Sequence, residues 1–266
     1  MEAKFEDGEV ILDKIVAVKR REVAQRKEMT PLSALEAAIE GMPPTRDFRR
    51  AIAGGTCTII AEVKRRSPSR GVIREDFDPV RIAREYERYG AAAVSVLTDE
   101  TFFGGSEADL TAVKSAISLP LLRKEFIIDP WQIHESRAIG ADALLLIAAI
   151  LEKSQLRKYR DIASSLGLAS LVEVHDRREM EMTLGSGAEI IGINNRDLRT
   201  FITDIGTSLA LAPVVPADRI IVSESGFGSR EEIEILLQAG VRAFLIGEAL
   251  VAAPDRRATF EELLGR

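Results

Sequence analysis

Charged and amide side chains recur at the ends of short apolar runs in this sequence, and their types are those that move protons and hold anions. They are Glu62, Lys64, Lys124, Glu173, Asn194, Arg196 and Glu224. Any one of them alone would be interpreted as a solvent-exposed charge, because charged residues are usually exposed. If they gather in one place, removing them from water costs free energy unless they form ion pairs or bind a ligand. Together they therefore indicate a catalytic site with perturbed pKa values.

Proton transfer is the chemistry that such a set supports. A lysine beside other cations has a lowered pKa and becomes a better acid, whereas neighbouring glutamates raise its pKa. The sequence leaves both effects open for Lys64 and Lys124. The two histidines, His134 and His175, lie outside any paired ligand motif, so no metal site is expected.

Two glycine-containing segments are candidate anion sites, namely Ser225-Gly226-Phe227-Gly228 and Gly247-Glu248. Glycine lets the backbone approach a phosphate, and the N–H groups at a helix start donate to it. The alternative, that these glycines only form tight turns, stays open.

The elements that must position these residues are short apolar runs that alternate with helical patterns. The predicted strands are 57–63, 92–97, 119–123, 143–147, 169–174, 190–193, 220–223 and 243–246. The predicted helices are 9–26, 32–39, 47–52, 80–89, 110–116, 131–139, 153–164, 177–184, 230–238 and 260–264. Several helices end in a glycine that leads into the next strand, as expected for a left-handed helix terminus: Gly90, Gly140, Gly167 and Gly240.

Alternating strands and helices predict a parallel α/β sheet. Eight such units, with no GxGxxG after the first strand, favour a closed (β/α)8 TIM barrel over an open dinucleotide-binding sheet. We predict one domain over 1–266, in which residues 1–55 form an N-terminal helical extension packed on the barrel. The apolar stripe from Val10 to Val23 is too narrow for a core of its own.

Barrel active sites lie at the C-terminal ends of the strands, where side chains alternate between the interior and the helix layer. This alternation sends Ile59, Ala61 and Val63 outward and Glu62 and Lys64 inward. On the third strand, Lys124 and Phe126 share the inward face, and Arg123 and Glu125 share the opposite face. Glu173, Asn194 and Glu224 point to the same mouth.

Composition narrows the class of protein. The 266 residues carry a formal net charge of −6, which argues against a general nucleic-acid binder. The single cysteine, Cys57, lies in an apolar run and is expected to be a small buried residue. There is no signal-peptide pattern and no apolar run of about 18 residues, so we expect a cytoplasmic protein without a membrane partner.

The segment IIAEVKRRSPSRG, from Ile59 to Gly71, carries an ExKxxSPS pattern. It resembles the signature of the indole-3-glycerol-phosphate synthase family. The resemblance continues through LTDETFFGGS, LLRKEFIID, DALLLIAAIL, LVEVH, GINNRDL, SESG and LIGEAL, and the N-terminal ILDKIVAVKRREV and PPTRDF are also similar. It therefore spans nearly the whole chain.

The resemblance implies a carbon-carbon lyase, a carboxy-lyase of tryptophan biosynthesis. Its substrate would be 1-(2-carboxyphenylamino)-1-deoxyribulose 5-phosphate, which closes to indole-3-glycerol phosphate with loss of carbon dioxide and water. By resemblance, Lys124 is the general acid that protonates the ketone oxygen, and Glu173 is the acid/base that assists dehydration. Lys64 holds the substrate carboxylate and is a candidate donor in a later step. Glu62 completes the catalytic set.

The resemblance also implies the binding residues. Those for the substrate are Ser67, Phe126, Leu145, Asn194, Arg196 and Glu224, and those for its phosphate are Ser225, Gly226, Gly247 and Glu248. Because a carboxylate beside phosphate would repel it unless turned away, we assign only the backbone N–H of Glu248. No cofactor and no metal are expected. The partner is a phosphorylated anionic small molecule, with no nucleic acid, no membrane and transient contact with other tryptophan-pathway enzymes.

Three alternatives remain. A class I aldolase would use Lys124 or Lys64 as a Schiff-base nucleophile. Phosphoribosylanthranilate isomerase, a sister barrel, is expected to lack the ExKxxSPS segment and the N-terminal extension. A binding scaffold without catalysis would require the charged residues at the mouth to be relics.

Overall fold

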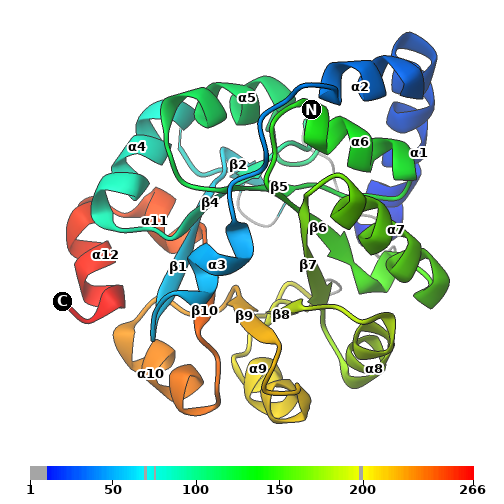
Figure 1. Ribbon diagram of the computed structural model, residues 1–266. Coiled ribbons are helices and arrows are strands. Elements are labelled where there is room, and N and C mark those ends of the chain that lie inside the picture. Colours follow the sequence, from blue (N-terminus) through cyan, green and yellow to red (C-terminus); the bar gives the residue numbers. More distant parts are fainter. Residues whose placement is uncertain (1–10, 69–70, 75, 198–199) are drawn as a thin grey trace.

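Eight parallel strands close into a barrel, and helices surround it (Figure 1). This computed structural model describes residues 11–68, 71–74, 76–197 and 200–266. The strands of the barrel are β1 (Thr58–Val63), β4 (Ala93–Leu97), β5 (Leu121–Lys124), β6 (Ala143–Ile147), β7 (Ala169–Val174), β8 (Ile190–Asn194), β9 (Ile220–Glu224) and β10 (Ala243–Ile246). Strand β1 closes the barrel by pairing with both β10 and β4. The predicted (β/α)8 barrel is confirmed.

The helices follow the predicted order. They are α1 (Ile11–Met29), α2 (Leu32–Ile39), α3 (Phe48–Ala53), α4 (Pro79–Tyr89), α5 (Glu107–Ala116), α6 (Pro130–Ala138), α7 (Lys153–Ser165), α8 (Arg177–Ser186), α10 (Arg230–Gln238) and α12 (Arg256–Leu264). At the end of α4, Gly90 has φ of 97° and its N–H donates to carbonyls of the last turn, which is the left-handed terminus expected from the sequence.

Several short elements were not predicted. They are the hairpin of β2 (Arg66–Ser67) and β3 (Gly71–Val72), the helices α9 (Gly206–Leu211) and α11 (Glu248–Ala252), and the 3₁₀ turns η1 (Ala148–Ile150) and η2 (Ala212–Val214). Residues 9 and 10 of the first predicted helix, Ser69 and Arg70 of the ExKxxSPS segment, and Leu198 lie outside the described residues.

The core has two layers, as the strand alternation predicts. Outward-facing Ile59, Ala61 and Val63 pack against the helices, while Ile60 belongs to a second cluster that fills the barrel interior. Phe48 and Ile52 of α3 join that inner cluster, so α3 closes one end of the barrel. In Figure 1, α3 lies across that end. The other end, where the strands terminate, is left for polar side chains.

The N-terminal helices contact the barrel layer directly. Val23 of α1 and Leu35 of α2 pack against Trp131 of α6, and the Trp131 indole N–H donates to the Thr30 carbonyl at 2.9 Å. Farther on, the Arg46 backbone N–H donates to the Asp142 carboxylate at 2.7 Å. These contacts hold α1, α2 and the segment after them against the helices of the barrel.

Two smaller findings complete the fold. Cys57 is half-buried, not fully buried as expected, because it precedes β1 at the entrance to the strand. Burial raises the pKa of its thiol. No helix within the described ranges is long and apolar enough to cross a membrane.

Candidate active site

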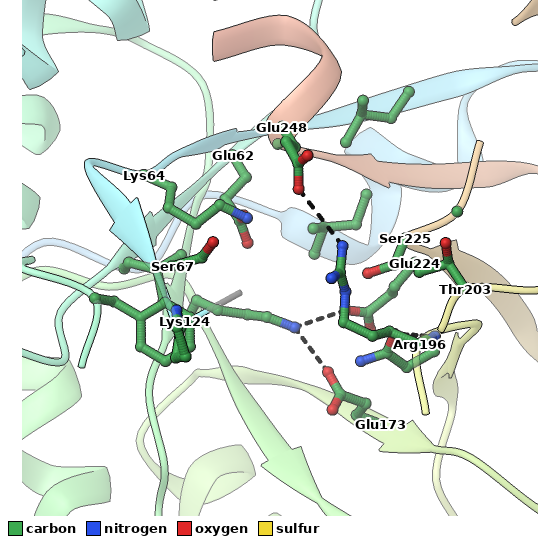
Figure 2. Close-up of a pocket in the computed structure, with 18 of the residues that line it drawn as sticks. Glu62, Lys64, Ser67, Lys124, Glu173, Arg196, Thr203, Glu224, Ser225 and Glu248 are labelled. Carbon is green, nitrogen blue, oxygen red and sulfur yellow. Dashed lines mark hydrogen bonds and ion pairs between the residues drawn. The ribbon is translucent and has the colours of Figure 1, made fainter. Parts of the chain in front are cut away.

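A pocket with a cavity volume of about 470 Å³ opens at the C-terminal ends of the barrel strands. All fourteen residues selected from the sequence line it. They are Glu62, Lys64, Ser67, Lys124, Phe126, Leu145, Glu173, Asn194, Arg196, Glu224, Ser225, Gly226, Gly247 and Glu248. Figure 2 shows side chains from several strands, among them Glu62, Lys124 and Glu173, pointing into the same space. The lining residues therefore form one polar site.

Lys124, the last residue of β5, lies between two carboxylates. Its Nζ is 2.7 Å from Oε2 of Glu173 and 2.6 Å from Oε2 of Glu224 (Figure 2). Burial lowers the pKa of the Lys124 ammonium, but the two carboxylates raise it by more, so the pKa lies above its usual range. Of the two effects left open by the sequence, the glutamates prevail. The raised pKa favours the protonated form of Lys124.

The two carboxylates beside Lys124 differ in their proton affinity. Burial raises the pKa of Glu173, but the charges of Lys124 and His175 lower it by more, and the pKa falls below its usual range. Burial raises the pKa of Glu224, Lys124 partly offsets this rise and the charge of Glu173 adds to it, which gives a pKa of about 7. The site thus holds one firmly ionised carboxylate and one that titrates near neutrality.

A second ion pair lies at the end of β1, where Nζ of Lys64, the residue after the strand, is 2.6 Å from Oε1 of Glu62. The Glu62 carboxylate packs against the backbone of Gly247, and a Cβ at that position would overlap it. A similar relationship joins Glu224 to Gly192 on β8, which also leaves room for a carboxylate. Gly192 was not selected from the sequence, because nothing local marks a glycine as the neighbour of a distant carboxylate.

Arg196 and Glu248 face each other across the pocket, with Nη2 of the arginine 3.5 Å from Oε2 of the glutamate (Figure 2). Asn194 supports this arginine, since its Oδ1 accepts the Arg196 backbone N–H at 3.0 Å. The Glu248 carboxylate is therefore directed toward a cation.

The turn after β9 has an unusual backbone. Ser225 has φ of 64° and Gly226 has φ of 82°, so two consecutive residues adopt the left-handed conformation, which costs energy for a serine. Asn195 stabilises this turn, because its Nδ2 donates to the Ser225 carbonyl and to Ser223 Oγ, each at 2.9 Å. The sequence did not reveal this role of Asn195. Such outliers cluster at ligand-binding positions.

An apolar wall completes the pocket. The rings of Phe103 and Phe126 lie 6.0 Å apart, and α1 adds Ile11, Leu12 and Ile15 to the lining. The sequence marked the apolar stripe of α1 as a packing surface only. The helix also forms part of the pocket, which suits a site for an aromatic ring.

Behind this wall lies a buried ionic network on the outward face of β5. The Nη2 atom of Arg123 is 2.8 Å from both Glu107 and Glu135, and the arginine is completely buried. Lys19 of α1 lies 2.9 Å from Asp99 and 3.0 Å from Glu125. Lys124 lines the pocket and the buried Arg123 does not, as predicted, whereas Glu125, predicted to share the face of Arg123, also lines the pocket. The charges of this network join α1 to the strand that carries Lys124.

Within the described ranges, no three His, Cys, Asp or Glu side chains form a group that could hold a metal ion. The chemistry available from the described side chains is acid-base chemistry, electrostatic stabilisation and anion binding.

Comparisons with known proteins find one family over nearly the whole chain. Residues 12–263 match the family model described as indole-3-glycerol phosphate synthase. A protein of that name from Aromatoleum aromaticum is 48% identical over 259 residues, covering 96% of this chain and 99% of the relative. Another from Acidithiobacillus ferrooxidans is 51% identical over 245 residues, covering 91% of this chain and 93% of the relative.

Among solved structures, a thiamine phosphate pyrophosphorylase from Pyrococcus furiosus superposes with a TM-score of 0.60, covering 79% of this chain and 95% of that one. At 16% identity this likeness concerns the fold alone.

Proposed function

Because this chain belongs to the indole-3-glycerol phosphate synthase family, we propose that its pocket closes the indole ring of 1-(2-carboxyphenylamino)-1-deoxyribulose 5-phosphate. The reaction releases carbon dioxide and water and gives indole-3-glycerol phosphate. The observation that carries the proposal is the position of Lys124 between Glu173 and Glu224 at the strand ends, where an acid and a base lie side by side.

Ring closure requires an acid at the ketone oxygen. Because its raised pKa favours the protonated form, Lys124 can donate a proton to that oxygen as the aromatic carbon bonds to the ketone carbon. The ketone becomes a hydroxyl group, and the lysine becomes neutral. The same aromatic carbon then loses carbon dioxide, and the electron pair of the broken carbon-carbon bond restores the aromaticity of the ring.

The substrate carboxylate needs a cation until it leaves as carbon dioxide. Lys64 is the candidate, because it lies in the same pocket and its present partner, Glu62, holds it in place. Replacing that internal carboxylate by the substrate carboxylate keeps the ammonium paired.

Dehydration requires a proton on the departing hydroxyl group. Glu173 begins as a carboxylate, so it can accept the proton that the neighbouring CH2 carbon of the new ring loses and deliver it to that hydroxyl as water leaves. Lys124 regains its proton from solvent. Glu224, with a pKa near 7, contacts Lys124 from the side opposite Glu173, and its charge raises the pKa of the lysine.

The phosphate is expected at the turn of Ser225 and Gly226 and at the backbone of Gly247 and Glu248. Support comes from the family resemblance, from the left-handed turn after β9 and from the usual phosphate position after the last two strands of such barrels. Glu248 contributes its backbone N–H, since its carboxylate is directed to Arg196.

The site favours this reaction over Schiff-base chemistry. A nucleophilic lysine must be neutral, and two carboxylates keep Lys124 protonated. Borohydride added during turnover should therefore leave no reduced covalent adduct on the protein.

The decisive experiment follows the fluorescence of the indole product formed from the synthetic substrate. Purified full-length protein is expected to turn the substrate over without any added cofactor, whereas Lys124→Ala at the same concentration serves as the matched blank. A folded wild-type protein that forms no product would overturn the proposed function.

Other expectations accompany this function. We propose that residues 1–55 and the barrel unfold together as one domain over 1–266, supported by the contacts of Lys19 and Trp131. A single cooperative transition, observed by both far-ultraviolet circular dichroism and Trp131 fluorescence, would test this. A cytoplasmic location, the absence of nucleic-acid and membrane partners, and transient contact with other tryptophan-pathway enzymes stay predictions.

A further inference from the structure

His175 follows β7 directly, and its imidazole ring lies between two carboxylates. Nε2 is 3.4 Å from Oε1 of Glu173, and Nδ1 is 3.1 Å from Oε2 of Glu179 on α8. The same Glu179 oxygen accepts the His175 backbone N–H at 2.7 Å. The Nε2 atom is buried, and among the described residues it has no hydrogen bond of good geometry, so its contact with Glu173 is mainly ionic.

These contacts extend the ionic arrangement around Lys124 by two residues. Oε2 of Glu173 faces Lys124, while its Oε1 faces the His175 ring. Charges alternate from Lys124 through Glu173 and His175 to Glu179. The Glu173 side chain is only 4% exposed, and its carboxylate is held at each oxygen by a different partner.

The two carboxylates that face the ring favour its charged form. Burial lowers the pKa of His175, but Glu173 and Glu179 raise it by more, to about 10. The charged groups that face Glu173 are Lys124 from β5 and His175 from β7, and Glu224 from β9 lies against the same Lys124 ammonium. The ring itself faces Glu173 and Glu179.

We propose that His175 is a positioning residue for the reaction: as an imidazolium fixed by Glu179, it holds Glu173 ionised, with Oε2 directed toward Lys124. The proposal rests on the function proposed above, in which Glu173 must begin as a carboxylate. His175 itself acts through Glu173 and is not assigned a contact with the substrate. Without the imidazolium, Glu173 would lose one of its two cations and could rotate away from Lys124.

Three variants and one control test this positioning role in steady-state turnover. We expect His175→Ala to lower kcat by about 10- to 100-fold, the usual cost of losing an outer partner that orients a reacting group, with KM changed much less. His175→Gln keeps a polar side chain without the charge, so its kcat should stay close to that of His175→Ala, and Glu179→Gln should show a smaller loss. The control is Glu181→Gln on the same helix, whose side chain is 68% exposed and should keep wild-type kcat.

The pH profile gives a readout that a purely structural role would not affect. In His175→Ala the pKa of Glu173 should rise, because one of the charges that lowers it is gone. The acidic limb of the kcat profile should therefore move to higher pH, relative to both wild type and Glu181→Gln. A His175→Ala variant with kcat within about twofold of wild type and an unmoved limb would overturn the proposal.

A titration without substrate separates this proposal from the proposed function. The chain has two histidines, so His134 provides an internal reference in the imidazole NMR spectrum. His175 is expected to stay protonated well above pH 8 in wild type and to titrate at lower pH in Glu179→Gln. If His175 titrates near 6.5 in wild type, the imidazolium is absent and the proposal fails, whether or not the protein turns over substrate. Lack of turnover alone would contradict only the proposed function.

Discussion

The Nζ atom of Lys19 lies 3.0 Å from Oε1 of Glu125, the residue that follows Lys124 in the chain. Lys19 is also 2.9 Å from Asp99, and all three side chains are almost fully buried. Burial lowers the pKa of Lys19, but the carboxylates raise it by more, so the ammonium stays charged. A single lysine of α1 therefore pairs with two buried acids, one of which directly follows the proposed general acid in the chain.

Replacing this lysine should cost much stability. Lys19→Met leaves Asp99 and Glu125 buried without their shared cation, a change that typically costs about 3–5 kcal/mol. The matched control is Lys27→Met on the same helix. The Lys27 side chain is 45% exposed and pairs with Asp129, so its loss should cost less than about 1 kcal/mol. Urea unfolding at pH 7 measures both, and equal midpoints for the two variants would contradict the role of Lys19.

Lys124→Ala should abolish most of the turnover while leaving substrate binding largely intact. A placed acid contributes about 10²- to 10⁴-fold, and this contribution is made mainly in the transition state. We expect kcat to fall by that order and KM to change much less. Saturating substrate and a folded variant are required for the measurement. Turnover close to wild type would remove Lys124 from the mechanism and leave Lys64 as the leading acid.

Lys64→Ala should instead affect binding as well as rate. If this lysine holds the substrate carboxylate, its loss removes a charge-assisted contact worth about 1.5–3 kcal/mol, and KM should rise by roughly tenfold or more. Lys64→Arg keeps the charge with a different geometry and should recover part of the binding. The comparison of KM among the three proteins tests this role. An unchanged KM in Lys64→Ala would reject it.

Glu173→Gln should stop the reaction after ring closure. Glutamine keeps the size and polarity of the side chain but cannot carry a proton, so kcat should fall on the order of 10²-fold. An intermediate that has lost carbon dioxide but still holds the hydroxyl group should accumulate, and rapid quenching with mass spectrometry would detect it. If only unreacted substrate is found, Glu173 acts before ring closure.

Glu224 predicts a stability that depends on pH. Its pKa is about 7 in the folded protein, against a usual value of 4.5, so the folded state holds the proton more tightly than the unfolded state. The stability from this group is fully present below about pH 4.5 and is lost as pH rises through 7. The glutamine of Glu224→Gln cannot ionise. The free energy of unfolding of this variant should therefore rise relative to that of wild type between pH 5 and 8, by an amount on the order of 2 kcal/mol.

Thermal unfolding at several pH values measures this difference. The control is Glu234→Gln on α10, whose side chain is 57% exposed and whose stability relative to wild type should stay nearly constant with pH. If the stability difference between Glu224→Gln and wild type is equally independent of pH, the pKa of Glu224 is not raised in the folded protein.

The barrel and many of the residues that line its pocket were predictable because the signals for them lie in short stretches of sequence. Alternating apolar residues identify each strand face, and a glycine such as Gly90 identifies a helix end. Once eight strands close, the rule that their C-terminal ends share one mouth brings residues as distant as Lys64 and Glu224 together.

What could not be predicted depends on contacts between distant segments. The sequence contains no signal that Glu173 and Glu224 both contact Lys124, so the direction of its pKa shift stayed open. The lining of the pocket by Ile15 and the support of the left-handed turn by Asn195 arise in the same way, from tertiary packing.

The ion pairs within the pocket have a kinetic consequence. Lys64 faces Glu62, Lys124 faces two glutamates, and Arg196 faces Glu248, so each of these cations has an internal counter-ion before any ligand arrives. An anionic substrate must exchange places with carboxylates that belong to the protein, and much of its attraction to the cations is cancelled by the pairs it breaks. The same carboxylates return when the product dissociates. The enzyme therefore holds anions less tightly than its cations alone would, and this arrangement favours rapid release over tight capture.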